Sequence, residues 1–552
     1  MRTRILVRHA DPYAGRGSKR GLAVQTSKRR SYRWLALVLK FGLISLAYGG
    51  ANETDSSAAG GIDPRATLTL GTVITLRIWN PHLAFAPGAA YELLAPVYDR
   101  LLLAEQDLSV GPMLAKSYEL SADHRSMTLH LRNDVTFSDG TPFNADVVKA
   151  NIDYTKVQNN SAAEIAKIVK NVTILDPYTV RLDFNADGTN FPLILAYDFT
   201  IGAMVSPKAL LDPKTLYITP NGSGPYKLVQ STTAQVVYEK VPNYWDKMVS
   251  SHLPQRLVLV TIANDNARLA ALRSGQIDGM AVSGPIPISE IKALTANGKI
   301  QLSTFSNSRI LNVYVNFSNP MLAKPEVRRA LSLAIDRNAI ASQIELGTAT
   351  AAVQPASKGD AVYNPGVQIL FDPKKAQSLL AAAGASSLTL KMMVVAAEPY
   401  ESIATVLQAQ WAAIGVKVQI TPVHSALAAT EWPKGRYDLW MGTAQGEPDE
   451  AFMMAQAFTG SGRMPFGTDP ELVSMDNAAS ILPLRSPQRE KAYQKINGYV
   501  AENPVTLIIA TWPMQLLTTK CVVGVNNVSY SQLLAIWDTR SLSKLRNCGP
   551  SQ

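Results

Sequence analysis

The chain has 552 residues, of which 47% are hydrophobic and 17% charged, and its formal net charge is +10 at pH 7. The hydrophobic content excludes an intrinsically disordered chain, and a count of two cysteines excludes a disulfide-dense scaffold. At roughly 150 residues per domain, this length predicts two to four domains, each large enough to bury a core.

The positive charge is confined to the N-terminal segment. Residues 1–50 hold 11 basic residues and one acid, whereas the remaining 502 residues hold 42 basic and 42 acidic residues. Because the body of the chain is electrically balanced, its composition does not support a basic groove for nucleic acid. We therefore expect no nucleic-acid partner.

Residues 1–50 have the order of a secretory leader. The basic stretch KRRSYR (28–33) precedes an apolar run of 16 residues (34–49), and small residues follow at 49–51. This order predicts a signal peptide that is cleaved near 49–51 and is followed by a polar linker at 51–65. A membrane anchor is the alternative, but Lys40 interrupts the run, and a membrane span needs about 20 apolar residues.

Export would place the mature chain in an oxidising compartment. There, Cys521 and Cys548 could form a disulfide near the C-terminus. Two unpaired thiols are the alternative, because the sequence does not supply the distance between their Cα atoms.

Strand-like and helix-like periodicities alternate along the body of the chain. A first strand at 67–79 ends at Asn80-Pro81, because proline cannot continue a central ladder, and a helix follows at 88–103. The pattern is α/β, without the period of a solenoid or propeller. Further strands are predicted at 126–132, 173–184, 235–241, 258–262, 310–317, 387–396, 416–421 and 437–442, and further helices at 144–156, 265–275, 324–346, 373–384, 400–415, 470–480 and 487–502.

Two helices in the C-terminal half carry local signals. In 324–340, apolar residues form a stripe, and we expect Arg328, Arg329 and Arg337 to project away from it. Asp372 followed by Pro373 predicts an N-cap with proline at the first helical position, and Gly384 predicts the end of that helix.

The chain contains no local catalytic constellation. The motifs G-x-S-x-G, G-x-x-x-x-G-K-[ST] and H-E-x-x-H are absent, and no two of the six histidines are close enough in sequence to form a local ligand pair. We therefore expect a binding protein without catalytic residues, metal site or cofactor.

Several segments carry a family resemblance. MTLHLRNDVTFSDGTPFNADVVKANIDY (127–154) contains the turn-and-helix block F-x-D-G-x-P-F, and GSGPYKL (222–228) pairs with VPNYWDK (241–247). Together with 270–280, 313–340, 371–384 and 407–420, these segments resemble the extracytoplasmic solute-binding proteins of ABC importers, family 5, the peptide/nickel-type group.

The resemblance implies an α/β, two-lobed periplasmic-binding-protein fold of type II, with an extra subdomain and two hinge strands. Such a protein is periplasmic and monomeric, and it captures a small solute between its lobes. It then delivers the solute to a membrane permease that is driven by a separate ATPase. Mapped by motif, lobe I comprises 66–306 and 514–552 with the extra subdomain at about 104–197, lobe II comprises 307–513, and the chain crosses between them at 307–311 and 509–514.

The same resemblance implies which residues face the ligand. They follow the first strand, the strand at 387–396 and the strand at 437–442: Trp79, Asn80, His82, Glu398, Tyr400, Thr443, Gln445, Glu447 and Asp449.

The sequence departs from the dipeptide-binding members at both charge anchors. Glu398 stands where those members have an arginine for the peptide carboxylate, and residues 442–446 contain no acid for the peptide ammonium. An ionic group that is buried without a partner costs several kcal/mol, so a short zwitterionic peptide is disfavoured. Glu398, Glu447 and Asp449 would make the cleft negative, which favours a cationic or neutral polar solute over such a peptide.

Two other functions remain open at this point. An exported hydrolase, either a peptidase or a glycosidase, could use a pair of cleft carboxylates. A binder that acts in chemosensing or chaperoning, without import, is a third reading. Turnover of a bound compound would favour the hydrolase, and neighbouring permease and ATPase genes would favour the importer.

Overall fold

The computed structural model describes residues 61–73, 78–83, 87–105, 109–197, 199–282, 286–344, 346–444, 449–460, 463–527, 538–546 and Cys548. The predicted leader (1–50), its cleavage site and the first part of the linker lie outside these residues. The end of the expected linker is anchored, because Ile62 forms a β-bridge with Leu545. Within the described ranges, no helix has both the length and the apolar character that crossing a membrane requires.

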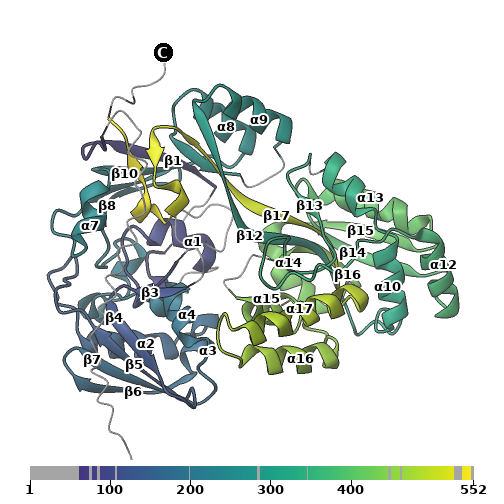
Figure 1. Cartoon of the computed structure of the whole chain (residues 1–552), viewed down its shortest axis with the longest axis horizontal. Helices are drawn as coiled ribbons and strands as arrows, with labels where there is room; N and C mark the ends of the chain where they lie inside the picture. Colours follow the sequence, from purple (N-terminus) through teal and green to yellow (C-terminus); the bar gives the residue numbers. More distant parts are fainter. Residues whose placement is uncertain are drawn as a thin grey trace, which may run out of the picture. The chain divides into compact units, whose positions relative to one another are not determined.

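One large mixed sheet runs through the described residues (Figure 1). Its strand order is β15-β14-β16-β12-β17-β11-β1-β10-β9-β8, and β13 pairs with β17 beside this path. The bounds are β15 (Lys417–Val423), β14 (Thr389–Val395), β16 (Leu439–Ala444), β12 (Ile300–Val315), β17 (Thr506–Thr519), β11 (Gly279–Ala281), β1 (Thr67–Thr72), β10 (Arg256–Thr261), β9 (Gln235–Lys240), β8 (Tyr226–Ser231) and β13 (Thr350–Ala351).

The long strands β12 and β17 connect two separate sets of buried residues. They pair antiparallel over nearly their whole length, with register shifts between Phe305 and Ser308 and between Leu311 and Asn312. In β12, Phe305 packs in one core and Ile310 in another. In β17 the same change falls between Trp512 and Met514. Core membership thus changes once in β12 and once in β17. We call the part of the chain between these two points lobe II, and the parts before and after it lobe I.

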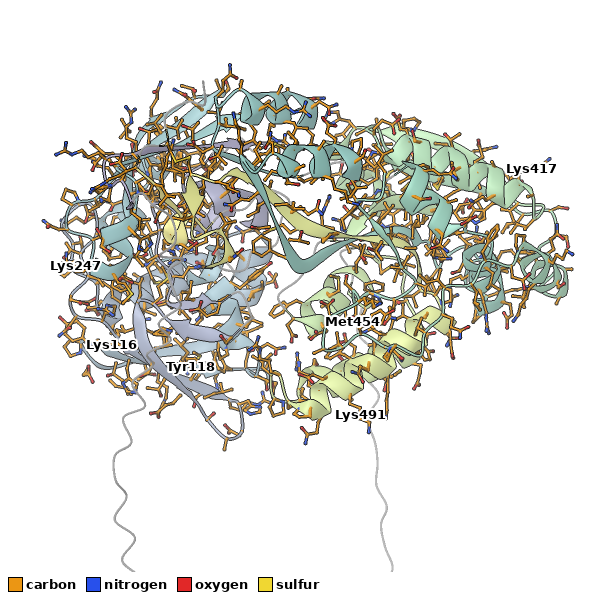
Figure 2. All side chains as sticks on the ribbon, turned by 45° about the horizontal axis from the view of Figure 1, so that its top comes forward. Lys116, Tyr118, Lys247, Lys417, Met454 and Lys491 are labelled. Carbon is orange, nitrogen blue, oxygen red and sulfur yellow. A yellow bond between two sulfur atoms is a disulfide. The ribbon has the colours of Figure 1, made fainter. Side chains whose placement is uncertain are left out.

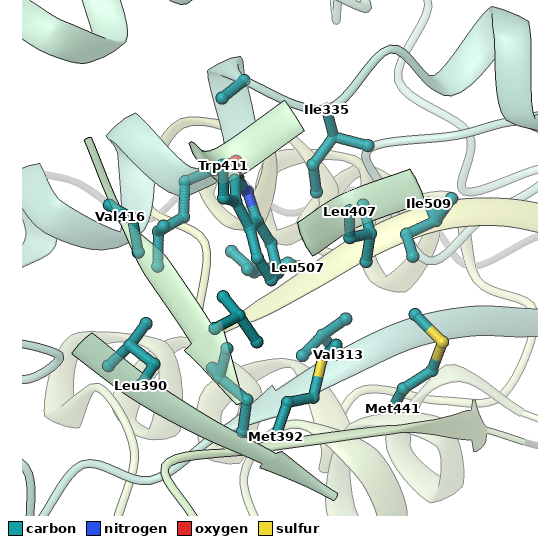
Figure 3. Packing of buried hydrophobic residues seen from close by; sticks show 14 of the residues in the cluster. Val313, Ile335, Leu390, Met392, Leu407, Trp411, Val416, Met441, Leu507 and Ile509 are labelled. Carbon is teal, nitrogen blue, oxygen red and sulfur yellow. Dashed lines mark hydrogen bonds between the residues drawn. The ribbon is translucent and has the colours of Figure 1, made fainter. Parts of the chain in front are cut away.

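The lobe II sheet carries a core on each face because its strand residues alternate. Val313 and Met441 contribute to one core, whereas Tyr314 and Trp440 contribute to the other. Figure 3 shows the first core, in which Trp411 packs over the strands. The helices over the first face are α10 (Pro325–Leu333), α11 (Arg337–Ala339), α12 (Pro373–Ala382) and α13 (Tyr400–Ala412), and those over the second are α14 (Ser425–Glu431), α15 (Glu450–Ala457), α16 (Pro470–Ser480) and α17 (Pro487–Glu502).

Lobe I contains the other half of the large sheet and a second, four-stranded sheet. The second sheet has the order β4-β5-β7-β6 and its own core, which runs from Leu101 to Met204 in sequence. We call this segment, with its separate sheet and core, the extra subdomain. Its elements are β2 (Leu102–Ala104), β3 (Val110–Pro112), β4 (Ala115–Leu120), β5 (Ser126–Leu131), α2 (Ala145–Lys156), α3 (Ser161–Ala166), β6 (Val169–Asp176), β7 (Thr179–Phe184), α4 (Phe191–Tyr197) and α5 (Phe199–Gly202).

The remaining elements of lobe I cover its part of the large sheet. Helices α8 and α9 pack their leucines, including Leu272 and Leu294, in a core that also contains Leu517 of β17. The bounds are α1 (Pro87–Leu94), α6 (Pro207–Leu211), α7 (Lys247–His252), α8 (Asp265–Arg273), α9 (Ile288–Ala296), β18 (Val522–Val523) and β19 (Ser543–Lys544).

Several predicted elements are shorter or more divided than expected. The first strand ends at Thr72 and the first helix at Leu94. The single helix predicted at 324–346 is divided, because Asp336 accepts a hydrogen bond from the Ala339 main-chain N–H and starts a new helix there. The strand predicted at 310–317 is the second half of β12.

The expectation for two arginines is corrected by the structure. Arg328 and Arg337 are buried rather than projecting to solvent, whereas Arg329 is exposed. Arg328 donates to the carbonyl oxygens of Leu322 and Pro504, at 2.9 and 2.7 Å. The sequence pattern places Arg328 outside the core. In the structure it is buried, and main-chain carbonyls take the place of water around its guanidinium.

Both predicted ends of α12 are confirmed. The Asp372 carboxylate accepts a hydrogen bond from the Lys375 N–H at 2.9 Å, and Gly384 has φ of +70° just beyond the helix. The charged surface follows the usual rule, with exposed side chains such as Lys116, Lys247, Lys417 and Lys491 pointing outward in Figure 2.

Candidate ligand-binding site

The loop after β1 is held inside lobe I. Trp79 is only 3% exposed and meets the Tyr238 ring edge-on, with ring centroids 6.3 Å apart. The Asn80 amide donates to the Tyr154 hydroxyl at 3.1 Å, and the two ring nitrogens of His82 lie 2.7 Å from Asn151 Oδ1 and 3.0 Å from Thr155 Oγ1. These three predicted ligand residues therefore already have partners within lobe I.

The predicted residues of lobe II meet at one edge of its sheet. Strand β14 runs parallel to β16, with Val394 beside Met441, so the loops that follow both strands leave the sheet at the same edge. Glu398 is exposed, and Tyr400 is half-buried at the start of α13. Thr443 is half-buried near the end of β16, opposite Leu311 of β12. This edge therefore adjoins the strands that connect the lobes. Gln445 and Glu447 lie outside the described residues.

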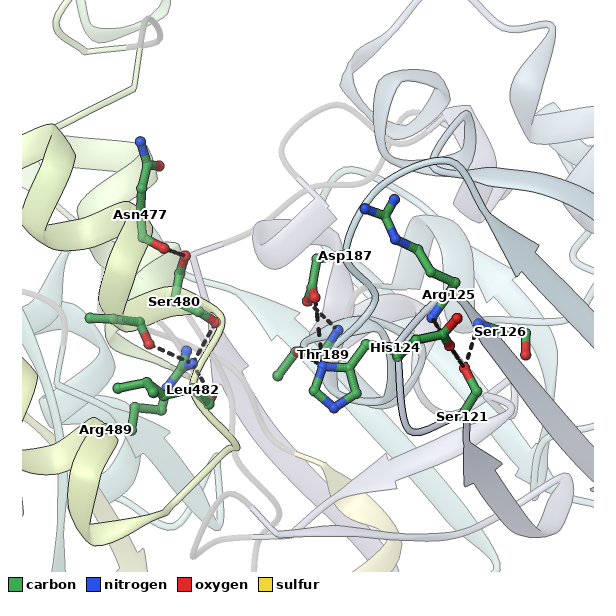
Figure 4. A network of polar contacts seen from close by, with 12 residues as sticks. Ser121, His124, Arg125, Ser126, Asp187, Thr189, Asn477, Ser480, Leu482 and Arg489 are labelled. Atoms are coloured by element: carbon green, nitrogen blue, oxygen red, sulfur yellow. Dashed lines mark hydrogen bonds and ion pairs between the residues drawn. The ribbon is translucent and has the colours of Figure 1, made fainter. Parts of the chain in front are cut away.

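Asp449 differs from the expectation of a free ligand carboxylate. It caps α15 by accepting from the Ala451 N–H at 2.9 Å, and it forms an ion pair with Arg489 at 2.5 Å. Arg489 is itself buried and also donates to the carbonyl oxygens of Ser480 and Leu482 (Figure 4). Asp449 therefore adds no net negative charge to the predicted site, because Arg489 already neutralises its carboxylate.

The same arginine reaches the other lobe. Arg489 Nη2 lies 3.4 Å from Asn190 Oδ1, which belongs to the extra subdomain. Phe452 and Leu484 of lobe II pack against the core of that subdomain. Next to this contact, burial and the neighbouring Asp449 raise the pKa of Glu450 to about 7. Polar and apolar contacts thus join the lobes here.

A polar group that the sequence analysis missed lies on the second face of the lobe II sheet. Asn312, Tyr314 and Trp440 are buried side by side, and the Arg463 guanidinium stacks over the Trp440 ring at 4.7 Å. The signal in the sequence is an asparagine in the middle of the apolar strand ILNVYVNF (310–317). Nothing in the sequence connects it with Arg463, which lies in a distant loop.

The described residues contain no group of three or more His, Cys, Asp or Glu side chains that could hold a metal ion. The structure joins Cys521 to Cys548 by a disulfide, with their Cα atoms 5.8 Å apart. The bond ties the turn after β17 to the C-terminal segment.

These features define the class of the protein. It has the two-lobed fold of type II periplasmic binding proteins, with an extra subdomain and two connecting strands. DppA from Helicobacter pylori, solved with the peptide STSA, superposes with a TM-score of 0.74 at 20% identity, over 88% of this chain and 99% of that one. NikA from Brucella suis, solved with Fe(III)-EDTA, has a TM-score of 0.73 at 22% identity, over 87% of this chain and 100% of that one.

Sequence comparison names the family. The model of the bacterial extracellular solute-binding proteins, family 5 (Middle), matches residues 109–466, more than half of the chain. The chain belongs to this family. The glutathione-binding protein GsiB of Salmonella typhimurium is 31% identical over 347 residues, and that of Escherichia coli K12 is 30% identical. Each match covers 60% of this chain and 65% of the relative, which is just under two thirds of its length.

Proposed function

We propose that this protein is the periplasmic substrate-binding component of an ABC importer. It captures a small polar solute between its two lobes and delivers the solute to a membrane permease that works with a separate ATPase. The observation that carries the proposal is the match to the family 5 solute-binding proteins on a two-lobed fold. Homologues that bind solutes rather than transform them disfavour the exported hydrolase.

The physical basis of capture is closure about the connecting strands. The two lobes have separate cores, so they can rotate as bodies without repacking either core. We place the hinge where core membership changes, at 307–311 in β12 and 509–514 in β17, which gives lobe I (66–306 and 514–552) and lobe II (307–513). The register shifts of β12 within and next to this stretch support that placement.

The ligand would bind at the edge of lobe II beside the hinge. Glu398, Tyr400 and Thr443 lie there, and Gln445 and Glu447 belong to the same loop in sequence. Trp79, Asn80 and His82 would support the site from lobe I, because their side chains are already engaged there. Relatives named for glutathione and peptides favour a peptide-like polar solute.

The export route follows from the leader. We propose that residues 1–50 direct secretion, that cleavage near 49–51 releases the mature protein, and that the protein acts as a monomer in the periplasm. A disulfide between Cys521 and Cys548 suits such an oxidising compartment.

A ligand screen tests the function. Mature protein beginning at residue 51 is heated with glutathione, di- and tripeptides, opines, sugars and metal chelates, and hits are measured by calorimetry. A ligand that binds only the folded state raises the unfolding temperature. At a concentration one hundred times its Kd, it adds about 2.7 kcal/mol to the free energy of unfolding. Mass spectrometry should find the bound compound unchanged. The absence of any stabilising compound, or its conversion to product, would contradict the proposal.

A further inference from the structure

The second face of the lobe II sheet gathers buried polar groups that have no hydrogen-bond partner among the described residues. Asn312 and Tyr314 are both 0% exposed, and Trp440 is 3% exposed. Neither amide atom of Asn312 nor the Trp440 indole N–H has a hydrogen-bond partner within the described part of the chain. Buried polar groups in folded proteins nearly always have partners, so partners from outside the chain are implied.

These groups are close neighbours because of the strand register. Asn312 is paired with Gly442, and Tyr314 is paired with Trp440. The indole lies over Gly442, since a Cβ at that glycine would stand 3.4 Å from Trp440 Nε1. The indole N–H therefore lies over the strand position directly opposite Asn312. Burial raises the pKa of the Tyr314 hydroxyl, and the charge of Arg463 opposes that rise.

Arg463 brings a positive charge to this group. Its guanidinium lies 4.7 Å above the Trp440 ring and 5.6 Å from the Tyr314 ring. The loop is anchored there, because the Arg463 carbonyl accepts from the Trp432 indole at 2.9 Å. Among the residues that the structure describes, no carboxylate forms an ion pair with Arg463. The contrast with Arg489 is clear, since that guanidinium is neutralised by Asp449.

We propose that Arg463, Trp440 and Asn312 form a subsite for a carboxylate group of the transported solute. No carboxylate of the described residues pairs with the Arg463 guanidinium, and the N–H fork of a guanidinium matches the two oxygens of a carboxylate. The Trp440 indole N–H and the Asn312 amide are the further donors of this buried group. The inference rests on the proposed function and extends it, because it assigns the solute a negative group rather than a purely cationic character.

The test compares a carboxylate probe with its ester in matched variants. Glutathione and glutathione diethyl ester, in which both carboxylates are blocked, are titrated into mature wild-type protein and into Arg463→Met. Methionine keeps the packing over Trp440 and removes the charge. The control is Arg132→Met, because Arg132 also stacks on a tryptophan, 4.2 Å from the Trp245 ring, but pairs with Asp134 in the extra subdomain.

We expect Arg463→Met to weaken glutathione binding by about 10- to 100-fold, the usual cost of losing a hydrogen-bonded charge partner. The diethyl ester should bind the wild type more weakly by a similar factor and should be insensitive to the substitution. Trp440→Phe, which removes only the indole donor, should weaken glutathione binding several-fold. Arg132→Met should bind as the wild type does. Circular dichroism and melting confirm that each variant is folded, and Arg463→Gln, which also removes the charge, replaces Arg463→Met if that variant is not.

The outcomes separate the two proposals. If glutathione binding is unchanged in Arg463→Met, or if the ester binds as tightly as the acid, the donors hold ordered water only and the subsite is refuted. The same conclusion follows if the ligand found in the screen has no carboxylate. In each of these cases the binding function stands. If no compound binds the wild type, the proposed function fails, and the subsite fails with it.

Discussion

Buried arginine side chains hold several loops of this protein against its cores. Within the described part of the chain, five arginines are among the largest fully buried side chains, and each donates to main-chain carbonyl oxygens. A guanidinium has five donors, so one side chain can satisfy several carbonyls at the ends of helices and strands. These residues pin loops to the cores: Arg100, Arg268, Arg328, Arg337 and Arg489.

Two adjacent arginines of α10 provide a matched comparison. Arg328→Met leaves the carbonyl oxygens of Leu322, Ala323 and Pro504 without this donor. We expect the free energy of unfolding to fall by about 2–4 kcal/mol in urea denaturation. Arg329→Met, at the exposed neighbouring position, should change it by less than about 0.5 kcal/mol. Equal effects would mean that burial of Arg328 does not matter.

A buried carboxyl predicts how stability depends on pH. Glu92 in α1 is fully buried, and burial raises its pKa to about 8, although the hydrogen bond from Thr72 and the charge of Arg268 oppose the rise. The unfolded chain loses this proton near pH 4.5 and the folded chain near pH 8. The stability contributed by Glu92 is therefore complete below about pH 4.5 and is lost as the pH rises to about 8.

Glu92→Gln removes this titration and keeps an acceptor for the Thr72 hydroxyl, which lies 2.6 Å from the Glu92 carboxylate. We expect the stability of the variant, relative to the wild type, to increase from pH 5 to pH 8 in urea unfolding curves. Glu326→Gln, at an exposed position of α10, serves as the control and should follow the wild type. Parallel pH profiles for Glu92→Gln and the wild type would show that Glu92 does not titrate in this range.

Among the elements, several helices begin at a side-chain cap, whereas others, such as α10 and α13, do not. Asparagine, aspartate or serine accepts a hydrogen bond from the first turn of several of them, as Asn144 does for α2 and Ser486 for α17. An additional cap within an apolar pattern divides a helix, and Asp336 has this effect after α10. Side-chain periodicity alone therefore overestimates the length of some helices.

The N-cap of α12 can be tested with a conservative control. Asp372→Ala removes the acceptor for the Lys375 N–H, and we expect a loss of about 1 kcal/mol in unfolding free energy. Asp372→Asn keeps a side-chain oxygen at this position and should retain most of the stability. Chemical denaturation followed by circular dichroism measures both. A loss of the same size in both variants would point to the charge rather than to the cap.

For the whole molecule, the described contact between the lobes combines polar and apolar side chains. Leu484 packs against the core of the extra subdomain, and Arg489 reaches Asn190 of that subdomain at 3.4 Å. Relative motion of domains is the default unless their interface is large and hydrophobic, and the lobes have separate cores, so this contact can open without unfolding either lobe. The solute would then shift the balance toward the closed state by its extra affinity for that state.

Leu484→Asp should favour the open state, because it places a charge in this apolar contact. We expect a larger radius of gyration in small-angle X-ray scattering of the unliganded protein, with a melting temperature close to that of the wild type. Ile481→Asp is the matched control, since Ile481 is 54% exposed in the same segment. An unchanged radius of gyration in Leu484→Asp would show that this contact does not hold the lobes together.

The sequence predicted the local features well. The two ends of α12 follow from its caps and the two-lobed fold from family motifs, all of which are written in consecutive residues, whereas strands such as β4, β8 and β11 were not predicted. The predicted ligand residues were harder to interpret, since Asp449 is neutralised by Arg489, 40 positions away in the chain. No local pattern marks such a pair.

By itself, the sequence determined the α/β class, the charge-balanced body and the family, because these depend on composition and short-range spacing. Only the tertiary structure decided which arginines are buried and which carboxylates stay free. It also brought Arg463 over Trp440 and Tyr314, beside Asn312. The physical reason is that strand register and helix packing decide which distant side chains meet, and those contacts determine which charges are left for a ligand.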